Sequence, residues 1–144
     1  MSEYKQPDIT LLGEEHVAKY RETDGEVGYE WNGATCLLLT TTGRHSGEPR
    51  TVPLIFAADG ERQVVVASKG GAPDDPQWYS NLAANPAVEV QVKGDRFTAT
   101  ARTALGGERD RCWALATAVW PNYDEYVKRT ERVIPVVVLE RSAG

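Results

Sequence analysis

The feature that most constrains the fold is a series of short apolar runs, rich in β-branched residues and separated by a few polar or glycine-containing residues. Residues 35–42 and 51–58 are predicted strands of this kind, and residues 63–68 follow after an Asp59-Gly60 hairpin signal. Strands joined by such short turns pair antiparallel, because a parallel pair needs a crossover of a dozen or more residues. The sequence therefore predicts an antiparallel meander or barrel.

Two helices interrupt this series of strands. The first is expected to start at Pro76, with Asp75 as its cap, and to end before Asn85. The second is expected over residues 107–119, and Pro121 ends it because proline cannot continue a helix. These helices pack at the openings of the predicted barrel.

Three more strands complete the prediction. Residues 88–92 alternate between apolar and polar, residues 97–103 are their partner, and residues 133–139 close the chain. Pro135 predicts that the last strand lies at an edge or carries a bulge, since proline has no N–H for the ladder. The expected fold class is α+β, with about six mainly antiparallel strands and flanking helices.

Composition indicates one domain. The 144 residues are 41% hydrophobic and 26% charged, within the ordinary globular range. We expect an N-terminal arm over residues 1–33, with a short helix over residues 11–22, folded against a cofactor-binding domain over residues 34–144. No apolar run is long enough to span a membrane or to act as a secretory signal, which predicts a cytoplasmic protein.

The net charge, the cysteines and the histidines argue against a nucleic-acid-binding protein and against a metalloprotein. A net charge of −5 argues against a nucleic-acid partner. Cys36 and Cys112 are interpreted as small buried hydrophobes, and His16 and His45 are too isolated to predict a metal site.

The loop over residues 43–50 lies between two predicted strands and contains two arginines. Arg44 and Arg50 come together if the segment folds back, and guanidinium forks match phosphate or carboxylate oxygens. Gly43 and Gly47 allow backbone N–H groups to approach the same anion. Taken alone, the loop is more often a solvated turn.

Two further polar segments, residues 68–71 and the start of the helix at Pro76, follow the strand predicted over residues 63–68. We expect pairing across the hairpin to bring Arg50 beside Ser68 and Lys69, and the helix that starts at Pro76 adds unpaired N–H groups. A groove for an elongated anion would result. The alternative for residues 68–71 is a flexible surface connection.

An aromatic segment begins where the second helix breaks. Tyr123 and Tyr126 share one helical face just after Trp120, and a tyrosine beside a redox ring can donate a proton to a substrate oxygen. Ordinary amphipathic packing is the alternative, and the sequence alone favours it.

The order of the motifs resembles the deazaflavin (F420)-dependent nitroreductase family. The resemblance covers about residues 35–140 and rests on LTTTGRHSGEPRTVPL, VASKGGAP, PQWYSNLAANP, WPNYDEY and IPVVVL. It implies a split β-barrel and coenzyme F420, whose phosphate and oligoglutamate tail are anionic. It also implies hydride transfer from the reduced deazaflavin to an electron-poor acceptor: a quinone, an activated enoate or lactone, or a nitro compound.

The resemblance also implies roles for individual residues. Those expected to take part in catalysis are Ser68, Trp120, Tyr123 and Tyr126. Those expected to bind the cofactor are Arg44, His45, Ser46, Arg50, Thr51, Val52, Pro53, Leu54, Ile55, Val66, Ala67, Ser68, Lys69, Gln77, Trp78, Tyr79, Ser80, Asn81 and Tyr123. The namesake of the family has tyrosine in place of Trp120 and Ile55 and lysine in place of His45.

Two other functions stay open at this point. One is an FMN-binding split-barrel oxidase, which would also place arginines on a phosphate. The other is a carrier that binds F420 without turnover. In each case we expect a small-molecule ligand, no nucleic acid, no stable membrane insertion, and a monomer or weak homo-oligomer.

Overall fold

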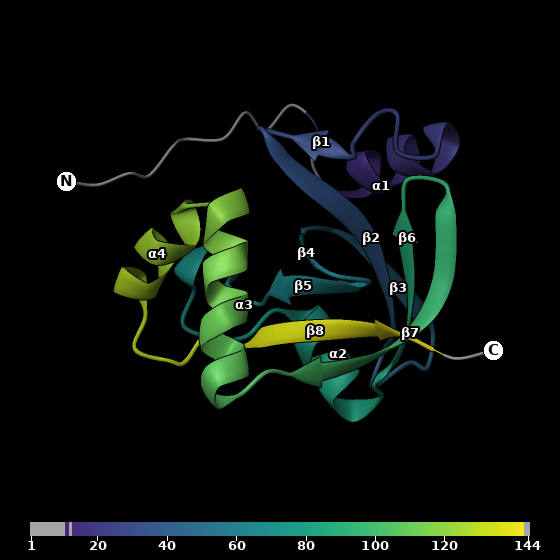
Figure 1. Cartoon of the computed structure of the whole chain (residues 1–144). Helices are drawn as coiled ribbons and strands as arrows, with labels where there is room; N and C mark the ends of the chain where they lie inside the picture. Colours follow the sequence, from purple (N-terminus) through teal and green to yellow (C-terminus); the bar gives the residue numbers. More distant parts are fainter. Residues whose placement is uncertain (1–10, 12, 143–144) are drawn as a thin grey trace.

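The computed structural model describes residue 11 and residues 13–142 (Figure 1). Its strands are β1 (Glu30–Trp31), β2 (Ala34–Thr42), β3 (Pro49–Ile55), β4 (Ala57–Asp59), β5 (Arg62–Val66), β6 (Ala87–Val92), β7 (Asp95–Thr103) and β8 (Val136–Arg141). Its helices are α1 (Gly13–Thr23), α2 (Gln77–Ala84), α3 (Gly106–Val119) and α4 (Asn122–Tyr126), with short 3₁₀ turns η1 (Lys69–Gly71) and η2 (Val127–Arg129).

The strands form one curled sheet in the order β1-β2-β6-β7-β8-β5-β4, and β3 pairs with β2 outside this path. Every pair is antiparallel. α3 packs on β4, β5 and β8 beside α4, while α1 packs on β3 and α2 on β2 (Figure 1). The predicted α+β fold, a split-barrel sheet with flanking helices, is confirmed.

The core follows from the alternation of the strands. Leu37 and Leu39 of β2 face Val65 of β5 and Val137 and Leu139 of β8, and all five side chains are buried. Truncating such a leucine to alanine typically costs about 2–5 kcal/mol. The sheet therefore provides a rigid wall on which loops can be positioned.

The predicted second strand is in fact two strands that separate at Phe56. Ile55 at the end of β3 pairs with Cys36 of β2, whereas Ala57 at the start of β4 pairs with Val64 of β5. The Phe56 N–H donates to the Thr35 carbonyl at 2.9 Å, and its ring is buried in the core. β3 thus stays with β2, and the prediction that hairpin pairing brings Arg50 beside Ser68 is wrong.

Two proline-based predictions also need correction. Pro76, not Asp75, occupies the position before the first turn of α2, and the Asp75 carboxylate instead binds Arg132. Pro135 precedes β8, which lies between β5 and β7 and is neither an edge strand nor interrupted. At this position just before β8, Pro135 takes part in backbone pairing only through its carbonyl, which accepts from the Ala67 N–H at 2.9 Å.

The N-terminal helix is built into the sheet through Tyr20. This side chain is fully buried; its hydroxyl donates to the Cys36 carbonyl at 2.9 Å and accepts from the Lys93 N–H at 2.8 Å. α1 covers most of the helix expected over residues 11–22. Residues 1–10 of the predicted arm lie outside the described residues.

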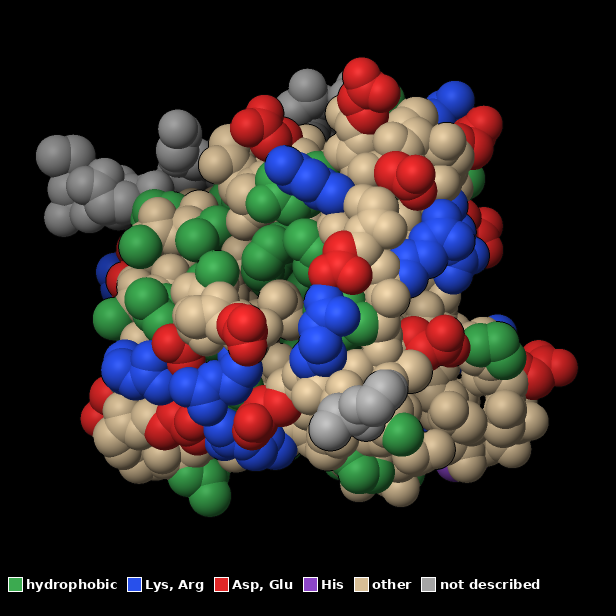
Figure 2. Space-filling view, turned by 45° about the vertical axis from the view of Figure 1, so that its right-hand side comes forward, with side chains coloured by type: hydrophobic (Ala, Val, Ile, Leu, Met, Phe, Trp, Pro, Cys, Tyr) green, Lys and Arg blue, Asp and Glu red, His purple; other side chains and the backbone are tan. Residues whose placement is uncertain are grey.

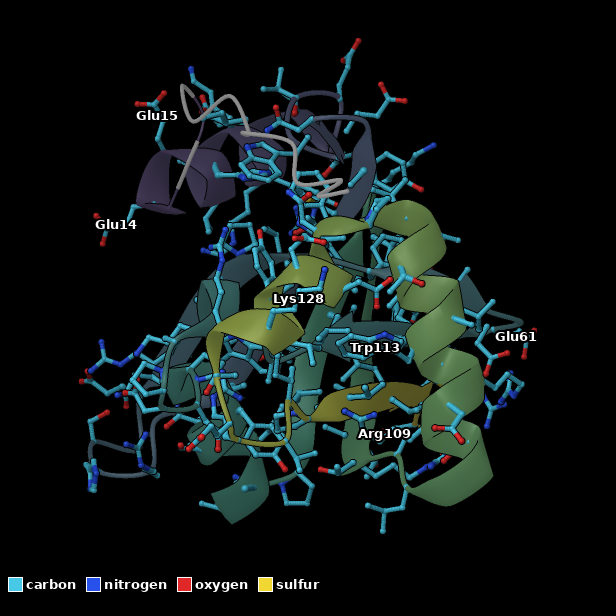
Figure 3. All side chains as sticks on the ribbon, turned by 90° about the vertical axis from the view of Figure 1, so that its left-hand side faces the viewer. Glu14, Glu15, Glu61, Arg109, Trp113 and Lys128 are labelled. Atoms are coloured by element: carbon cyan, nitrogen blue, oxygen red, sulfur yellow. The ribbon has the colours of Figure 1, made fainter. Side chains whose placement is uncertain are left out.

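α3 and α4 are joined by polar contacts near the start of β8. Trp113 and Arg109 project from α3 (Figure 3). The Trp113 indole donates to Asp124 at 2.9 Å, and Arg109 donates to the Ile134 carbonyl at 2.8 Å. The position of the α4 segment is therefore set by the longest helix.

Basic and acidic side chains alternate over much of the surface that Figure 2 displays. Many of them form ion pairs: Arg102, for example, donates to both carboxylate oxygens of Glu108 and also pairs with Glu140. Arg50 differs, because none of the described residues forms an ion pair with it.

Candidate functional site

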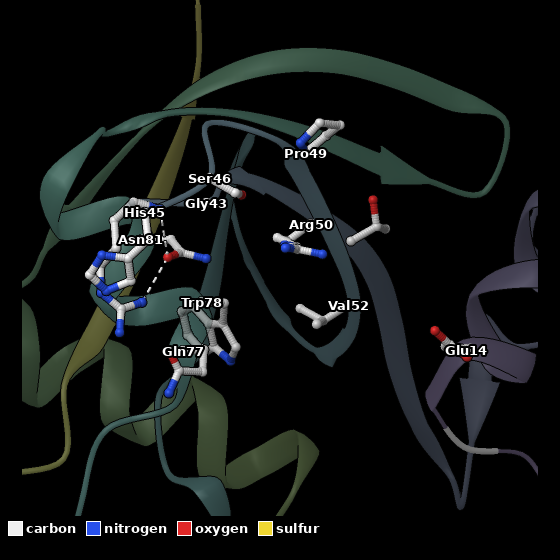
Figure 4. A pocket seen from close by; sticks show the side chains of 12 residues that line it. Glu14, Gly43, His45, Ser46, Pro49, Arg50, Val52, Gln77, Trp78 and Asn81 are labelled. Atoms are coloured by element: carbon white, nitrogen blue, oxygen red, sulfur yellow. Dashed lines mark hydrogen bonds between the residues drawn. The ribbon is translucent and has the colours of Figure 1, made fainter.

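Two adjoining cavities contain most of the predicted site, and Val52 and Trp78 line both of them. The first, here called the basic cavity, has a volume of about 560 Å³ and lies between the 43–50 loop, β3 and α2 (Figure 4). The second, here called the aromatic cavity, has a volume of about 450 Å³ and is reached by the Trp120–Tyr126 segment. One groove thus contains a cationic part and an aromatic part.

Nearly all the predicted residues line this groove. In the basic cavity are Arg44, His45, Ser46, Arg50, Thr51, Val52, Gln77, Trp78 and Asn81. In the aromatic cavity are Val52, Pro53, Leu54, Ile55, Val66, Ser68, Lys69, Trp78, Trp120, Tyr123 and Tyr126. Ala67, Tyr79 and Ser80 line neither cavity: Ala67 is in the core, and the Tyr79 hydroxyl bonds Thr103 at 2.9 Å.

The 43–50 loop folds back on itself through its own backbone. The Gly43 N–H donates to the Glu48 carbonyl and the Gly47 N–H to the Gly43 carbonyl, both at 2.8 Å. A Cβ atom on Gly43 would lie 2.7 Å from the Ser46 hydroxyl oxygen, so a larger residue there would require the Ser46 side chain to move. This closure presents both arginines of the loop to the same cavity.

Arg44 also ties the loop to α2. Its backbone N–H and its guanidinium donate to the side-chain oxygen of Asn81 at 3.2 and 2.9 Å (Figure 4). The amide of Asn81 in turn donates to the Thr41 hydroxyl at 3.2 Å. Buried Asn81 therefore fixes the loop against both β2 and α2.

The start of α2 adds to the positive potential. No side chain caps the helix at Pro76, so the first N–H groups, those of Gln77 and Trp78, have no partner within the helix. Both residues line the basic cavity, as does Arg50. Unpaired guanidinium, free N–H groups and a helix dipole together suit a phosphate or carboxylate, with Glu14 as the one acidic residue of the lining.

The aromatic cavity is walled by two pairs of rings, one tilted and one edge-to-face. Trp31 lies 5.7 Å from Trp120 and Tyr123 lies 6.1 Å from Tyr126, centroid to centroid. The Trp120 indole donates to the Tyr126 hydroxyl at 3.3 Å. An apolar, planar molecule would fit against this wall.

Tyr123 is the buried phenol of this cavity. Burial raises the pKa of its hydroxyl well above the ordinary value, with a smaller contribution from Tyr126, so it keeps its proton at neutral pH. None of the described residues hydrogen-bonds this hydroxyl. It is therefore a donor with no protein acceptor, on a cavity that can hold a ligand.

Six lining residues of the aromatic cavity were not predicted as site residues: Gly13, His16, Trp31, Cys36, Gly70 and Pro76. His16 and Tyr20 lie four apart on the buried face of α1, and His16 Nε2 bonds the Gly28 carbonyl at 2.8 Å. That spacing was the available signal, but only tertiary packing brings α1 to the cavity. Cys36 is free, as expected for a small buried hydrophobe, and burial raises the pKa of its thiol to about 12.

Comparison with known proteins decides the family. The profile of the family described as F420H(2)-dependent quinone reductase matches residues 12–141. The chain belongs to this family. An F420H(2)-dependent quinone reductase of Mycobacterium tuberculosis strain H37Rv is 46% identical over 130 residues, which are 88% of this chain and 87% of the relative.

Two solved structures resemble this quinone reductase family member closely. An F420-H2 dependent reductase (FDR-A) is 44% identical, with a TM-score of 0.69 over 73% of this chain and 93% of that one. A structure described as a domain-swapped dimer is 39% identical, with a TM-score of 0.72 over 88% and 95% of the two chains. The resemblance drawn from the motifs is thus confirmed at the level of the family.

The residues present fit the cofactor that the family name implies. Arg50, which has no ion pair among the described residues, and the uncapped start of α2 at Gln77 and Trp78 suit an anionic group in the basic cavity. The aromatic cavity adjoins it at Trp78, as a ring joined to a phosphate requires. Among the described residues, no group of three His, Cys, Asp or Glu gathers as a metal site needs, and no helix is long and apolar enough to cross a membrane.

Proposed function

We propose that this family member reduces a quinone with a hydride from reduced F420. The observation that carries the proposal is the junction at Trp78, where a cationic cavity meets an aromatic one that contains the unpartnered Tyr123 hydroxyl. Family membership and the quinone reductase activity for which the 46% identical relative is named support the same reaction.

The basic cavity would hold the anionic part of the cofactor. Arg50 and Arg44 supply guanidinium donors, and the first turn of α2 supplies backbone N–H groups. Arg44 is oriented before binding by its two bonds to Asn81, which lowers the entropy lost when a ligand arrives. When bound, F420H2 supplies a hydride from its deazaflavin ring.

The aromatic cavity would hold the quinone acceptor and the edge of the deazaflavin ring. Tyr123 and Ser68 are placed to donate hydrogen bonds to a quinone oxygen as negative charge develops on it. The Trp31 and Trp120 rings, inclined by 42° to each other, provide apolar surface on the same cavity. The acceptor is held beside a donor that keeps its proton at neutral pH.

The proposal also covers the range of acceptors, the oligomeric state and the location of the protein. Activated enoates, lactones and nitro compounds are further electron-poor acceptors for the same geometry. We propose a monomer or weak homo-oligomer, although one relative is a domain-swapped dimer, and size-exclusion chromatography with light scattering tests this. Cys36 and Cys112 are both free, which agrees with the proposed cytoplasmic location.

The deciding experiment titrates the purified protein with oxidised F420 and, separately, with FMN. Reduced F420 is then mixed with menadione, and the absorbance of the deazaflavin is followed. We expect F420 binding and quinone-dependent oxidation. A yellow, FMN-loaded preparation would favour the oxidase, and tight F420 binding without reduction of any quinone, enoate or nitro acceptor would favour a carrier.

A further inference from the structure

Arg132, which is distant in sequence, donates hydrogen bonds to the backbone around Ser68. Its side chain is only 15% exposed and lies in the connection between η2 and β8. The guanidinium donates to four acceptors: the carbonyls of Ala67 (3.3 Å), Ser68 (2.8 Å) and Ala72 (2.9 Å), and the Asp75 carboxylate (2.9 Å). All four acceptors belong to the segment between β5 and α2.

The acceptors flank a turn that would otherwise be unfavourable. Lys69, Gly70 and Gly71 have φ values of 48°, 64° and 85°, three consecutive residues in the left-handed region. A lysine there crowds its Cβ against the backbone, so the conformation must be held by its surroundings. Arg132 bonds to this segment both before and after the turn.

The opposite side of the turn packs against the segment that bears the phenols. A Cβ atom on Gly71 would lie 2.8 Å from the Tyr126 carbonyl oxygen and 2.8 Å from Arg129 Cβ. The Arg129 guanidinium also donates to the Gly70 carbonyl at 3.3 Å. The turn is thus confined between α4 and η2 on one side and the Arg132 guanidinium on the other.

We propose that Arg132 is a positioning residue for the reduction, which acts on the acceptor through Ser68; this inference rests on the proposed function. Ser68 is 7% exposed and lines the aromatic cavity. Its carbonyl is bonded to Arg132, and none of the described residues bonds its hydroxyl, which is therefore available to an acceptor oxygen. Only the planar fork of arginine can serve four acceptors at once; lysine has three donors on a single nitrogen.

A double-mutant cycle tests the route through Ser68. The variants are Arg132→Gln, Ser68→Ala and the double variant, measured for kcat and KM with reduced F420 and menadione. We expect Arg132→Gln to lower kcat about tenfold to a hundredfold, as displaced groups in active sites do. In the Ser68→Ala background the same change should cost no more than about twofold, since coupled residues are not additive.

Additive losses in that cycle would overturn the proposal, as would full activity of Ser68→Ala. Guanidinium ion should restore part of the kcat of Arg132→Ala, while sodium at the same ionic strength should not. Arg109→Gln is the matched control: Arg109 projects from α3 (Figure 3) and, like Arg132, donates to a backbone carbonyl, that of Ile134, but it lines neither cavity. It should leave kcat within about twofold of the wild type.

Hydrogen exchange gives a readout that needs neither cofactor nor turnover. The Gly71 N–H donates to the Ser68 carbonyl and the Ala72 N–H to the Lys69 carbonyl. Arg132→Gln should speed exchange of these two amides at least tenfold more than that of the β8 amides. Uniform acceleration would mean a merely structural role and would contradict the proposal; Asp75→Asn replaces Arg132→Gln if the latter fails to fold.

A wild-type protein that fails to oxidise reduced F420 with any quinone would refute the proposed function alone. The exchange measurement would still decide whether Arg132 holds the turn. Conversely, an active wild type with an unaffected Arg132→Gln variant would refute only the positioning role. The two failures are therefore distinguishable.

Discussion

The backbone N–H and the guanidinium of Arg44 converge on one atom, the Oδ1 of Asn81, at 3.2 and 2.9 Å. Asn81 is buried on α2, so this pair fixes the basic loop to the helix whose N-terminus faces the same cavity. Asn81→Ala should therefore lower the free energy of unfolding by about 1–3 kcal/mol, because it removes the hydrogen bonds of a buried side chain to Arg44 and Thr41. It should also weaken F420 binding, as measured by titration of the fluorescence of the deazaflavin.

Tyr79→Phe is the control for that prediction on the same helix. Tyr79 lines neither cavity, and its exposed hydroxyl bonds Thr103. The variant should bind F420 with unchanged affinity. If both variants weaken binding equally, Asn81 acts through the general stability of α2 and not by orienting Arg44.

The strands and the anion-binding loop could be predicted from sequence because their signals are local. The content of β-branched residues identified the position of β2, and the glycine spacing around Arg44 and Arg50 identified the loop. The break at Phe56 could not be predicted, because it depends on β3 and β4 choosing different partners. Local pattern carries no information about which distant strand a residue meets.

The errors at Asp75 and Pro135 have the same origin. Aspartate before Pro-Gln is a reasonable cap signal, but Arg132, 57 residues away in sequence, takes the carboxylate. Pro135 argues against a central strand only if it lies within the strand, and β8 begins one residue later. His16 and Trp31 were missed as cavity residues for a related reason, since α1 reaches the cavity only through long-range packing.

Arg50→Ala should weaken F420 binding about tenfold at low salt. Arg50 has no ion pair among the described residues, so its charge is available to an anion, and a charge-assisted hydrogen bond of this kind is worth about 1.5–3 kcal/mol. The loss should shrink at high ionic strength and grow with the length of the acidic tail. Titrations at two salt concentrations with cofactors of different tail length measure both trends.

Arg96→Ala provides the charge-matched control, since Arg96 pairs with Asp24 and lies outside the basic and aromatic cavities. Its affinity for F420 should equal that of the wild type. Equal losses in the two variants would indicate a general effect of net charge and would remove Arg50 from the site.

Tyr123→Phe should lower kcat with quinone at least tenfold and leave F420 affinity nearly unchanged. The substitution preserves the ring packing against Tyr126 and removes only the hydroxyl. Because burial raises the pKa of Tyr123, the wild-type rate should show no loss with a midpoint near pH 10, where an ordinary tyrosine ionises. Steady-state rates from pH 7 to the alkaline limit of stability test this, and a drop centred near pH 10 would point to a different donor.

The folded protein should lose stability at alkaline pH. Burial raises the pKa of Cys36 from 9.0 to about 12 and that of Tyr20 from 10.0 to about 12, and it raises the pKa of Tyr123 as well. At a pH between the pKa of the unfolded state and that of the folded state, each of these groups keeps its proton in the native state and loses it in the unfolded state. The unfolded state then binds fewer protons, so the free energy of unfolding falls as pH rises, by up to about 1.4 kcal/mol per pH unit for each group. The stabilisation is complete below about pH 9 and is lost progressively above it.

Urea unfolding at intervals from pH 8 to pH 11 measures this decline, with Cys36→Ala as the matched variant. Cys36 is one of two thiols whose pKa burial raises, the other being Cys112, so the variant should show a shallower decline than the wild type from about pH 9 upward. Above about pH 10 the phenols of Tyr20 and Tyr123 add the same further decline to both proteins. Loss of the packing of the thiol lowers the free energy of unfolding equally at every pH. The comparison is unaffected, because the prediction concerns the change of this free energy with pH and not its absolute value. Identical slopes in both proteins would mean that the Cys36 thiol titrates normally in the folded state.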